Sequence, residues 1–132
     1  MRYLLDTHAL VWWIDAPERL TRSMRAAISK TGPQTPLLVS DISLLEIATL
    51  AGLGRLAFTL PLRDWLERAT AAPLVERVPI TPAIAGEVSV LPASFHRDPG
   101  DRVIVATARV LGASVITRDR LIVDSKVVET IS

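Results

Sequence analysis

The stretch DPGDRVIVATARVLGASVITRD, residues 98–119, decides the fold class of this chain. Asp98 followed by a proline is a strong helix start, so we expect a helix over Pro99–Leu111 that ends at Gly112. Residues 114–117 then form a short, uninterrupted segment that favours a β-strand. Strands made of continuous apolar runs, rather than of alternating apolar and polar residues, are typical of a parallel sheet covered on both faces when they alternate with helices.

The rest of the chain repeats this alternation. Further strands are expected at residues 3–5, 37–39, 74–80 and 127–128. Helices are expected at residues 7–15, 20–30, 41–50, 61–72 and 82–91, with a short helical turn after Asp119. The sequence therefore predicts a single domain, residues 1–132, folded as a three-layer α/β/α sandwich with a central, mainly parallel sheet.

The composition removes several functional classes. The chain has no cysteine, which excludes a disulfide scaffold, a thiolate metal site and a cysteine nucleophile, and it has only two histidines, His8 and His96. Neither a phosphate-binding P-loop motif nor a dinucleotide-binding glycine motif is present. No apolar run reaches about 18 residues, and acidic Asp6 comes too early for a secretory leader, so we expect a cytoplasmic protein that does not cross a membrane.

Four acidic residues are predicted to meet at one edge of the sheet. Asp6 follows the first strand directly, and Asp119 comes two residues after the strand that ends at Thr117. Asp101 lies in the first turn of its helix and Glu46 in the second turn of another. Because the functional crevice of an open parallel sheet lies at the carboxyl ends of its strands, all four side chains can reach it.

Each of these acids also has a simpler explanation. Asp6 and Asp119 are placed to cap helix starts, and Glu46 lies three residues after Ser43, as in a capping box. We assign Asp98 to capping outright. Capping does not explain convergence, however, because several carboxylates close together repel one another unless they bind a proton or a cation. Oxygen ligands of this kind select Mg²⁺ or Mn²⁺, which can assist the hydrolysis of a phosphodiester.

Four segments, in this order, resemble the PIN-domain family and, within it, the toxin ribonucleases of VapBC type. They are LLDTHAL at residues 4–10, SDISLLEIA at 40–48, HRDPGDRVIVATA at 96–108 and VITRD at 115–119. The resemblance implies a Mg²⁺-dependent (or Mn²⁺-dependent) endoribonuclease that is the toxin of a toxin–antitoxin pair. It also implies a VapB-type antitoxin as partner, RNA as substrate and a homodimer.

The resemblance also implies roles for individual residues. The acidic metal site would consist of Asp6, Glu46, Asp101 and Asp119, with Asp6 and Asp101 as the most direct ligands. The auxiliary residues would be Asp98, Thr7, which is expected to orient the Asp6 carboxylate or a metal-bound water, and Thr117, the small hydroxyl residue beside the last acid. Two alternatives stay open: a catalytically silent PIN-fold interaction module, and a metal-dependent nuclease or phosphatase that acts on DNA or on small phosphoesters.

The neighbours of these acids are harder to interpret. Arg102 and Arg118 each have two equal interpretations, a contact to substrate phosphate or an ion pair with the adjacent acid. We interpret His96 as a surface or loop-bracing residue rather than a general acid, and His8 as structural. Many relatives carry an aromatic residue at the position of Gly100, so the resemblance implies a more mobile loop here.

Three tryptophans are unusual in a chain with only 5% aromatic residues. Trp12 and Trp13 are adjacent on a helix and therefore about 100° apart, so they cannot both face the same line of the core. A large side chain at the rim of the core is the simpler interpretation. The resemblance instead favours a groove, lined by Trp12, Trp13 and Trp65, in which an amphipathic segment of the antitoxin docks.

Overall fold

The computed structural model describes all 132 residues, and its centre is a five-stranded sheet. Its strands are β1 (Tyr3–Leu5), β2 (Leu37–Ser40), β3 (Val75–Val78), β4 (Ser114–Ile116) and β5 (Thr130–Ile131). Their order is β3-β2-β1-β4-β5, and every neighbouring pair is parallel. The prediction of an α/β protein with a parallel sheet is therefore confirmed.

Seven helices surround the sheet. They are α1 (Thr7–Asp15), α2 (Arg22–Ser29), α3 (Asp41–Gly52), α4 (Leu62–Ala69), α5 (Pro82–Val90), α6 (Pro99–Leu111) and α7 (Arg120–Ser125), and a single 3₁₀ turn, Pro17–Arg19, follows α1. The helix starts follow the chemistry of the sequence. Thr21 caps α2, and Thr81 caps α5 directly before its proline.

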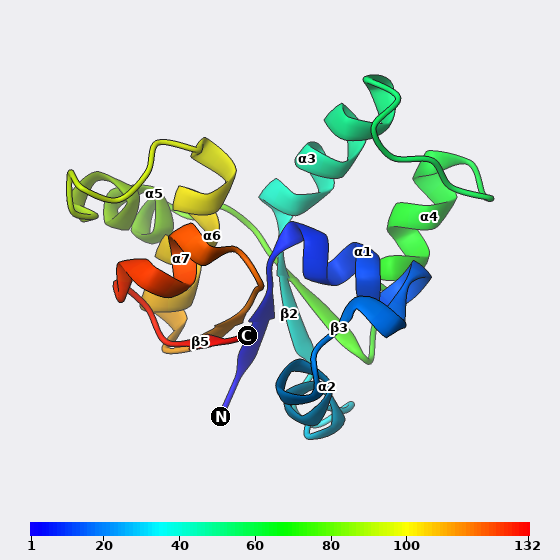
Figure 1. Cartoon of the computed structure of the whole chain (residues 1–132), viewed down its shortest axis with the longest axis horizontal. Coiled ribbons are helices and arrows are strands. Elements are labelled where there is room, and N and C mark those ends of the chain that lie inside the picture. The colour runs from blue at the N-terminus through cyan, green and yellow to red at the C-terminus, as the bar shows by residue number, and fades with distance from the viewer.

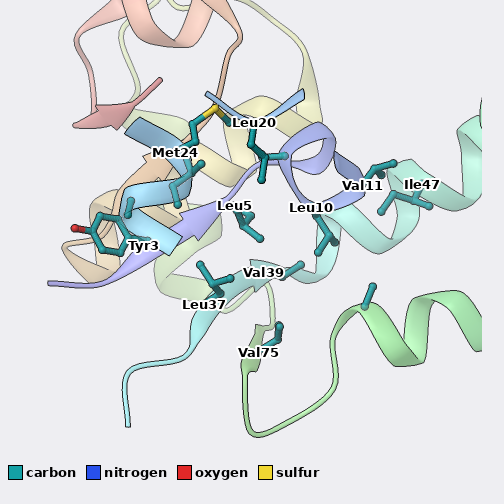
Figure 2. Packing of buried hydrophobic residues seen from close by; sticks show 14 of the residues in the cluster. Tyr3, Leu5, Leu10, Val11, Leu20, Met24, Leu37, Val39, Ile47 and Val75 are labelled. Atoms are coloured by element: carbon teal, nitrogen blue, oxygen red, sulfur yellow. The ribbon is translucent and has the colours of Figure 1, made fainter. Parts of the chain in front are cut away.

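The alternation of side chains along the strands divides the core into two layers. Leu5 and Val39 lie in the cluster that packs against α1, α2 and α4, whereas Leu4 and Leu38 pack against α5 and α6. Figure 1 shows these two groups of helices on opposite sides of the sheet. Figure 2 shows the first layer, in which β1, β2 and β3 present apolar side chains to the N-terminal helices.

The predicted last strand was placed wrongly, at residues 127–128 instead of Thr130–Ile131. Val127 and Val128 are apolar because they pack against the clusters around α6 and α7, not because they pair in the sheet. The strand predicted at 74–80 is shorter, and its two central residues are exposed, as the edge position of β3 allows.

The strand order determines where a crevice opens. From β1 the chain moves to β2 and β3 on one side, and it then crosses to β4 on the other side of β1. Such a reversal between neighbouring strands is the point at which open α/β sheets bind ligands, at the carboxyl ends of the strands. Here that point lies between the ends of β1 and β4. None of the helices has the length and apolar character needed to cross a membrane.

Candidate active site

Asp6 joins the ends of the two strands at this point. It lies directly between β1 and α1 with only 5% of its surface exposed. Its Oδ1 accepts the N–H of Ala9 at 2.8 Å, which caps α1, and its Oδ2 accepts the hydroxyl of Thr117. The Thr117 hydroxyl oxygen also accepts the N–H of Asp119 at 2.9 Å. Burial raises the pKa of Asp6 above its usual range, although the hydrogen bonds from Thr117 and Ala9 oppose that shift.

Asp119 is also a helix cap that faces the crevice. It precedes α7, and its Oδ1 accepts the N–H of Leu121 at 2.8 Å. Asp6 and Asp119 therefore each cap a helix and also belong to the acidic cluster, so the two explanations of these residues are compatible. A carboxylate has two oxygens, so one can serve the helix start while the residue still contributes to the acidic cluster.

Glu46 reaches the same region from α3. The Thr7 hydroxyl donates a hydrogen bond to Glu46 Oε1 and lies 2.9 Å from the hydroxyl of Ser43, which is fully buried. Burial raises the pKa of Glu46. Thr7 thus orients a carboxylate, as its position implied, but that carboxylate belongs to Glu46 and not to Asp6.

The capping-box interpretation of Glu46 is wrong. Helix α3 begins one residue after Ser40, whose Oγ accepts the N–H of Ile42 at 3.2 Å. Ser43 is already inside the helix and bonds to Thr7 instead. Glu46 is consequently free of any capping role, and its orientation depends on the contact with α1.

Asp101 lies in the first turn of α6. Asp98 accepts the N–H of Asp101 at 3.0 Å, so the prediction that Asp98 caps α6 is confirmed. Burial is the main cause that raises the pKa of Asp101 to about 8, and the nearby charges of Asp98, Asp119, Glu46 and Asp6 add to it, in that order. All four predicted acids therefore influence one another electrostatically.

His96 lies in a group of three side chains that could together hold a metal ion. Ligand atoms of His96, Asp101 and Asp119 all lie within 4.8 Å of one another. The His96 Nε2 atom is 3.3 Å from Asp101 Oδ2, but it is buried and makes no hydrogen bond. Sequence reasoning underrated His96, since its side chain is only 19% exposed. The available signal was its position two residues before the cap of α6.

The interpretation of Arg102 as the ion-pair partner of Asp101 is wrong. Its guanidinium donates to the backbone carbonyls of Phe95 and His96 at 3.2 Å each and to that of Val88 at 3.4 Å. It also lies over the Phe95 ring, with 5.9 Å from Cζ to the ring centroid. Arg102 therefore holds the segment that carries His96, and it pairs with no acid.

Arg118 and Trp12 line a cavity beside the acids. The cavity measures about 280 Å³ and is lined by Asp6, His8, Trp12, Arg118 and Asp119. The Arg118 guanidinium stacks over Trp12 at 5.7 Å and donates to a backbone carbonyl, that of Arg19, at 3.1 Å. Arg118 makes no ion pair with Asp119, so its charge stays available to a ligand in this cavity.

The three tryptophans do not line one groove. Trp65 is 3% exposed, stacks on Phe58 with 4.3 Å between ring centroids, and donates its indole N–H to Asp15 at 3.0 Å. Trp65 is thus a core residue, which corrects its assignment to a docking surface. Trp12 faces the cavity beside the acids, and Trp13 is half-buried against the core.

Gly100 does not lie in a loop but is buried in the first turn of α6. A Cβ atom at this position would lie 2.1 Å from Glu46 Oε2 and 2.3 Å from Glu46 Cδ. The Glu46 carboxylate occupies the space into which a side chain at position 100 would extend. The departure from the family at Gly100 therefore corresponds to close packing rather than to a mobile segment.

The chain belongs to the PIN domain family, whose model matches residues 3–124. Ribonuclease VapC22 of Mycobacterium tuberculosis is 39% identical to it over 117 residues, which cover 89% of this chain and 86% of that protein.

The fold is shared with solved toxin–antitoxin complexes. The VapBC2 complex of Rickettsia felis, bound to a promoter DNA fragment, contains a chain with a TM-score of 0.73 and 15% identity, with 98% of this chain and 97% of that chain covered. A chain of the DNA-bound VapBC complex of Salmonella typhimurium has a TM-score of 0.70 and 17% identity, and the match covers 98% of this chain and 96% of that chain.

The donor set fits the divalent metal on which PIN nucleases generally depend. Carboxyl groups with raised pKa values gather here, and a buried ring nitrogen that makes no hydrogen bond lies 3.3 Å from one of them. Such a set is costly unless protons or a cation neutralise it.

Proposed function

We propose that this protein is a divalent-metal-dependent endoribonuclease and the toxin of a VapBC-type toxin–antitoxin pair. The observation that carries the proposal is the grouping of acids near the carboxyl ends of β1 and β4. Asp6 and Asp119 line one cavity, and donor atoms of Asp101 and Asp119 lie within 4.8 Å of each other. The Glu46 carboxylate lies against Gly100 at the start of the helix that carries Asp101. The 39% identity to a protein named as a ribonuclease supports the reaction class.

We propose Mg²⁺ or Mn²⁺ as the metal, held by Asp101 and Asp119, whose donor atoms lie within 4.8 Å of each other. Asp6, expected as a direct ligand, is proposed at the side of the site with Glu46, because both of its oxygens already accept hydrogen bonds. A divalent ion in such a site activates water and offsets the negative charge that develops during phosphodiester hydrolysis. Thr117 and Thr7 keep the carboxylates of Asp6 and Glu46 in place through hydrogen bonds.

The cavity beside the acids is the proposed contact for the RNA strand. Arg118, which the Trp12 ring supports from one side, offers a guanidinium suited to phosphate. Asp6 and Asp119 line the same cavity, so a phosphate held by Arg118 lies next to the acids. Water attacks the scissile phosphate in line, and the product carries a 5′-phosphate.

The partner of the proposed toxin is a VapB-type antitoxin, and the toxin itself forms a homodimer in the cytoplasm, where its RNA substrate is found. Structural neighbours that are toxin–antitoxin complexes support the partner. Copurification of the chain with the product of an adjacent short reading frame tests it. A neighbour that neither binds the chain nor blocks its activity contradicts this part of the proposal.

The activity is tested by incubating the purified protein with single-stranded RNA, in Mg²⁺, in Mn²⁺ and in EDTA. Asp6→Asn and Asp101→Asn should abolish metal-dependent cleavage and keep the fold. Asparagine at position 6 caps α1 as well as aspartate does, and Asp101 caps no helix, because Asp98 is the cap of α6. Asp41→Asn is the matched control, since Asp41 forms an exposed ion pair with Arg77 outside the site. This control should cleave normally.

Parallel reactions with DNA and with a small phosphoester separate the remaining classes. Cleavage of DNA in preference to RNA contradicts the ribonuclease assignment. A folded protein that binds no Mn²⁺ and cleaves none of the three substrates is instead a catalytically silent interaction module. Cleavage that persists in Asp101→Asn identifies a contaminating nuclease.

A further inference from the structure

We propose that His96 supplies a nitrogen ligand to the divalent ion, alongside Asp101 and Asp119, and that the site therefore prefers transition-metal ions to Mg²⁺. This inference rests on the proposed metal dependence of the protein. His96 would add an imidazole nitrogen to the carboxylate oxygens of the site, and it lies in the segment that precedes α6.

The geometry of His96 carries the inference. Its Nε2 atom is shielded from solvent, makes no hydrogen bond, and lies in a group whose donor atoms are all within 4.8 Å of one another. Two ligands on opposite sides of an ion with bonds of about 2.1 Å lie about 4.2 Å apart, so small side-chain rotations suffice for coordination. Its nearest charged group is Asp101 Oδ2 at 3.3 Å, another member of this group, and no hydrogen bond joins the two. A buried polar atom that makes no hydrogen bond is rare in folded proteins and calls for an explanation such as a bound ion.

The segment around His96 is held in place independently of the acids. Arg102 binds the carbonyls of Phe95 and His96, and Phe95 is 3% exposed in the cluster with Leu91. The rings of Phe95 and His96 are 4.6 Å apart. The one charged group that His96 Nε2 contacts is Asp101 Oδ2 at 3.3 Å, and Asp101 is itself a proposed metal ligand, so this nitrogen faces the site rather than the loop.

The chemistry of the ligand sets the expected selectivity. Mg²⁺ takes oxygen ligands and keeps several waters, whereas imidazole nitrogen suits transition metals. A site with two carboxylates and one imidazole therefore binds Mn²⁺ more tightly than Mg²⁺, and Co²⁺ more tightly than Mn²⁺. Removal of the imidazole should reduce this preference.

The test uses Mn²⁺ as a paramagnetic probe on the full chain. Because the chain has only His8 and His96, two variants assign any imidazole signal. Pulsed electron paramagnetic resonance of the wild-type protein with Mn²⁺ should detect ¹⁴N coupling from an imidazole. The coupling should disappear in His96→Gln and persist in His8→Gln. His96→Gln should also weaken Mn²⁺ binding by at least about tenfold, the lower end of the cost of losing even an indirect metal partner, with a smaller change for Mg²⁺.

Several results would overturn the inference. They are Mn²⁺ bound without ¹⁴N coupling in the wild type, loss of the coupling in His8→Gln, and equal weakening of Mn²⁺ and Mg²⁺ binding in His96→Gln. The first of these leaves the proposed nuclease intact, whereas a wild-type protein that binds no Mn²⁺ contradicts both proposals. If His96→Gln does not fold, the spectra of the wild type and of His8→Gln decide the question.

Discussion

Replacing Gly100 with alanine should lower activity while leaving the protein folded. The new Cβ would lie 2.1 Å from Glu46 Oε2, far inside van der Waals contact. The atoms it meets belong to the end of a flexible side chain, so Glu46 moves and the backbone of α6 stays. Glu46 then loses its hydrogen bond from Thr7 and its place in the acidic crevice.

The two effects on stability nearly cancel. Loss of one hydrogen bond costs about 0.5–1.5 kcal/mol. Alanine in place of glycine within a helix contributes about 0.5–1 kcal/mol in the other direction. The free energy of unfolding should therefore change by less than about 1 kcal/mol. Activity should fall by about 100-fold, which is the typical cost of displacing a positioned group by about 1 Å.

The assay compares RNA cleavage rates with urea denaturation for the same preparations. Gly86→Ala is the matched control, because Gly86 lies in α5, is exposed, and has nothing within 4 Å of the added Cβ. This control should gain about 0.5–1 kcal/mol and keep full activity. In a Glu46→Ala background, Gly100→Ala should have no further effect on the rate, because the displaced carboxylate is absent. Full activity of Gly100→Ala would refute the role given to Glu46.

Three further predictions concern stability and pH. Without divalent metal, the free energy of unfolding should decrease as pH rises from about 4 towards 8. Burial raises the pKa of Asp101 to about 8, so over this interval the native state keeps a proton that the unfolded chain releases. A melting temperature in EDTA that rises over this interval would contradict the prediction. Trp65→Ala should cost about 3–5 kcal/mol in urea denaturation, whereas a loss below about 1 kcal/mol would indicate that Trp65 is a surface residue after all. Thr117→Val should cost about 1–3 kcal/mol, because it leaves buried Asp6 without one partner, and it should slow RNA cleavage; an unchanged rate would mean that the hydroxyl does not position Asp6.

The fold was predictable because each element carries its own local signals. Residues 98–119 contain a cap, a proline, a glycine stop and a short β-favouring strand, and α6 and β4 follow these signals closely. The meeting of Asp6 and Asp119 followed from strand geometry alone, since Asp6 comes directly after β1 and Asp119 shortly after the parallel neighbour β4. The last strand was misplaced because Val127 and Val128 are apolar for a packing reason that hydropathy does not distinguish from pairing.

The partners of long side chains were not predictable. Arg102 neighbours Asp101 in the chain but reaches three backbone carbonyls, because the helix directs it towards the segment before α6. Trp65 is a residue type that is common on docking surfaces, but its position on α4 directs the side chain into the core. The place of His96 depends on the path of the chain between α5 and α6, which no periodic pattern encodes.

The central claim, that a divalent ion binds among these carboxylates, is tested most directly by anomalous diffraction from crystals of the protein grown with Mn²⁺. We predict one strong Mn²⁺ peak at the carboxyl ends of β1 and β4, within bonding distance of Asp101 and Asp119. Mn²⁺ found only elsewhere on the molecule, with these carboxylates still held by protein groups alone, would contradict the account.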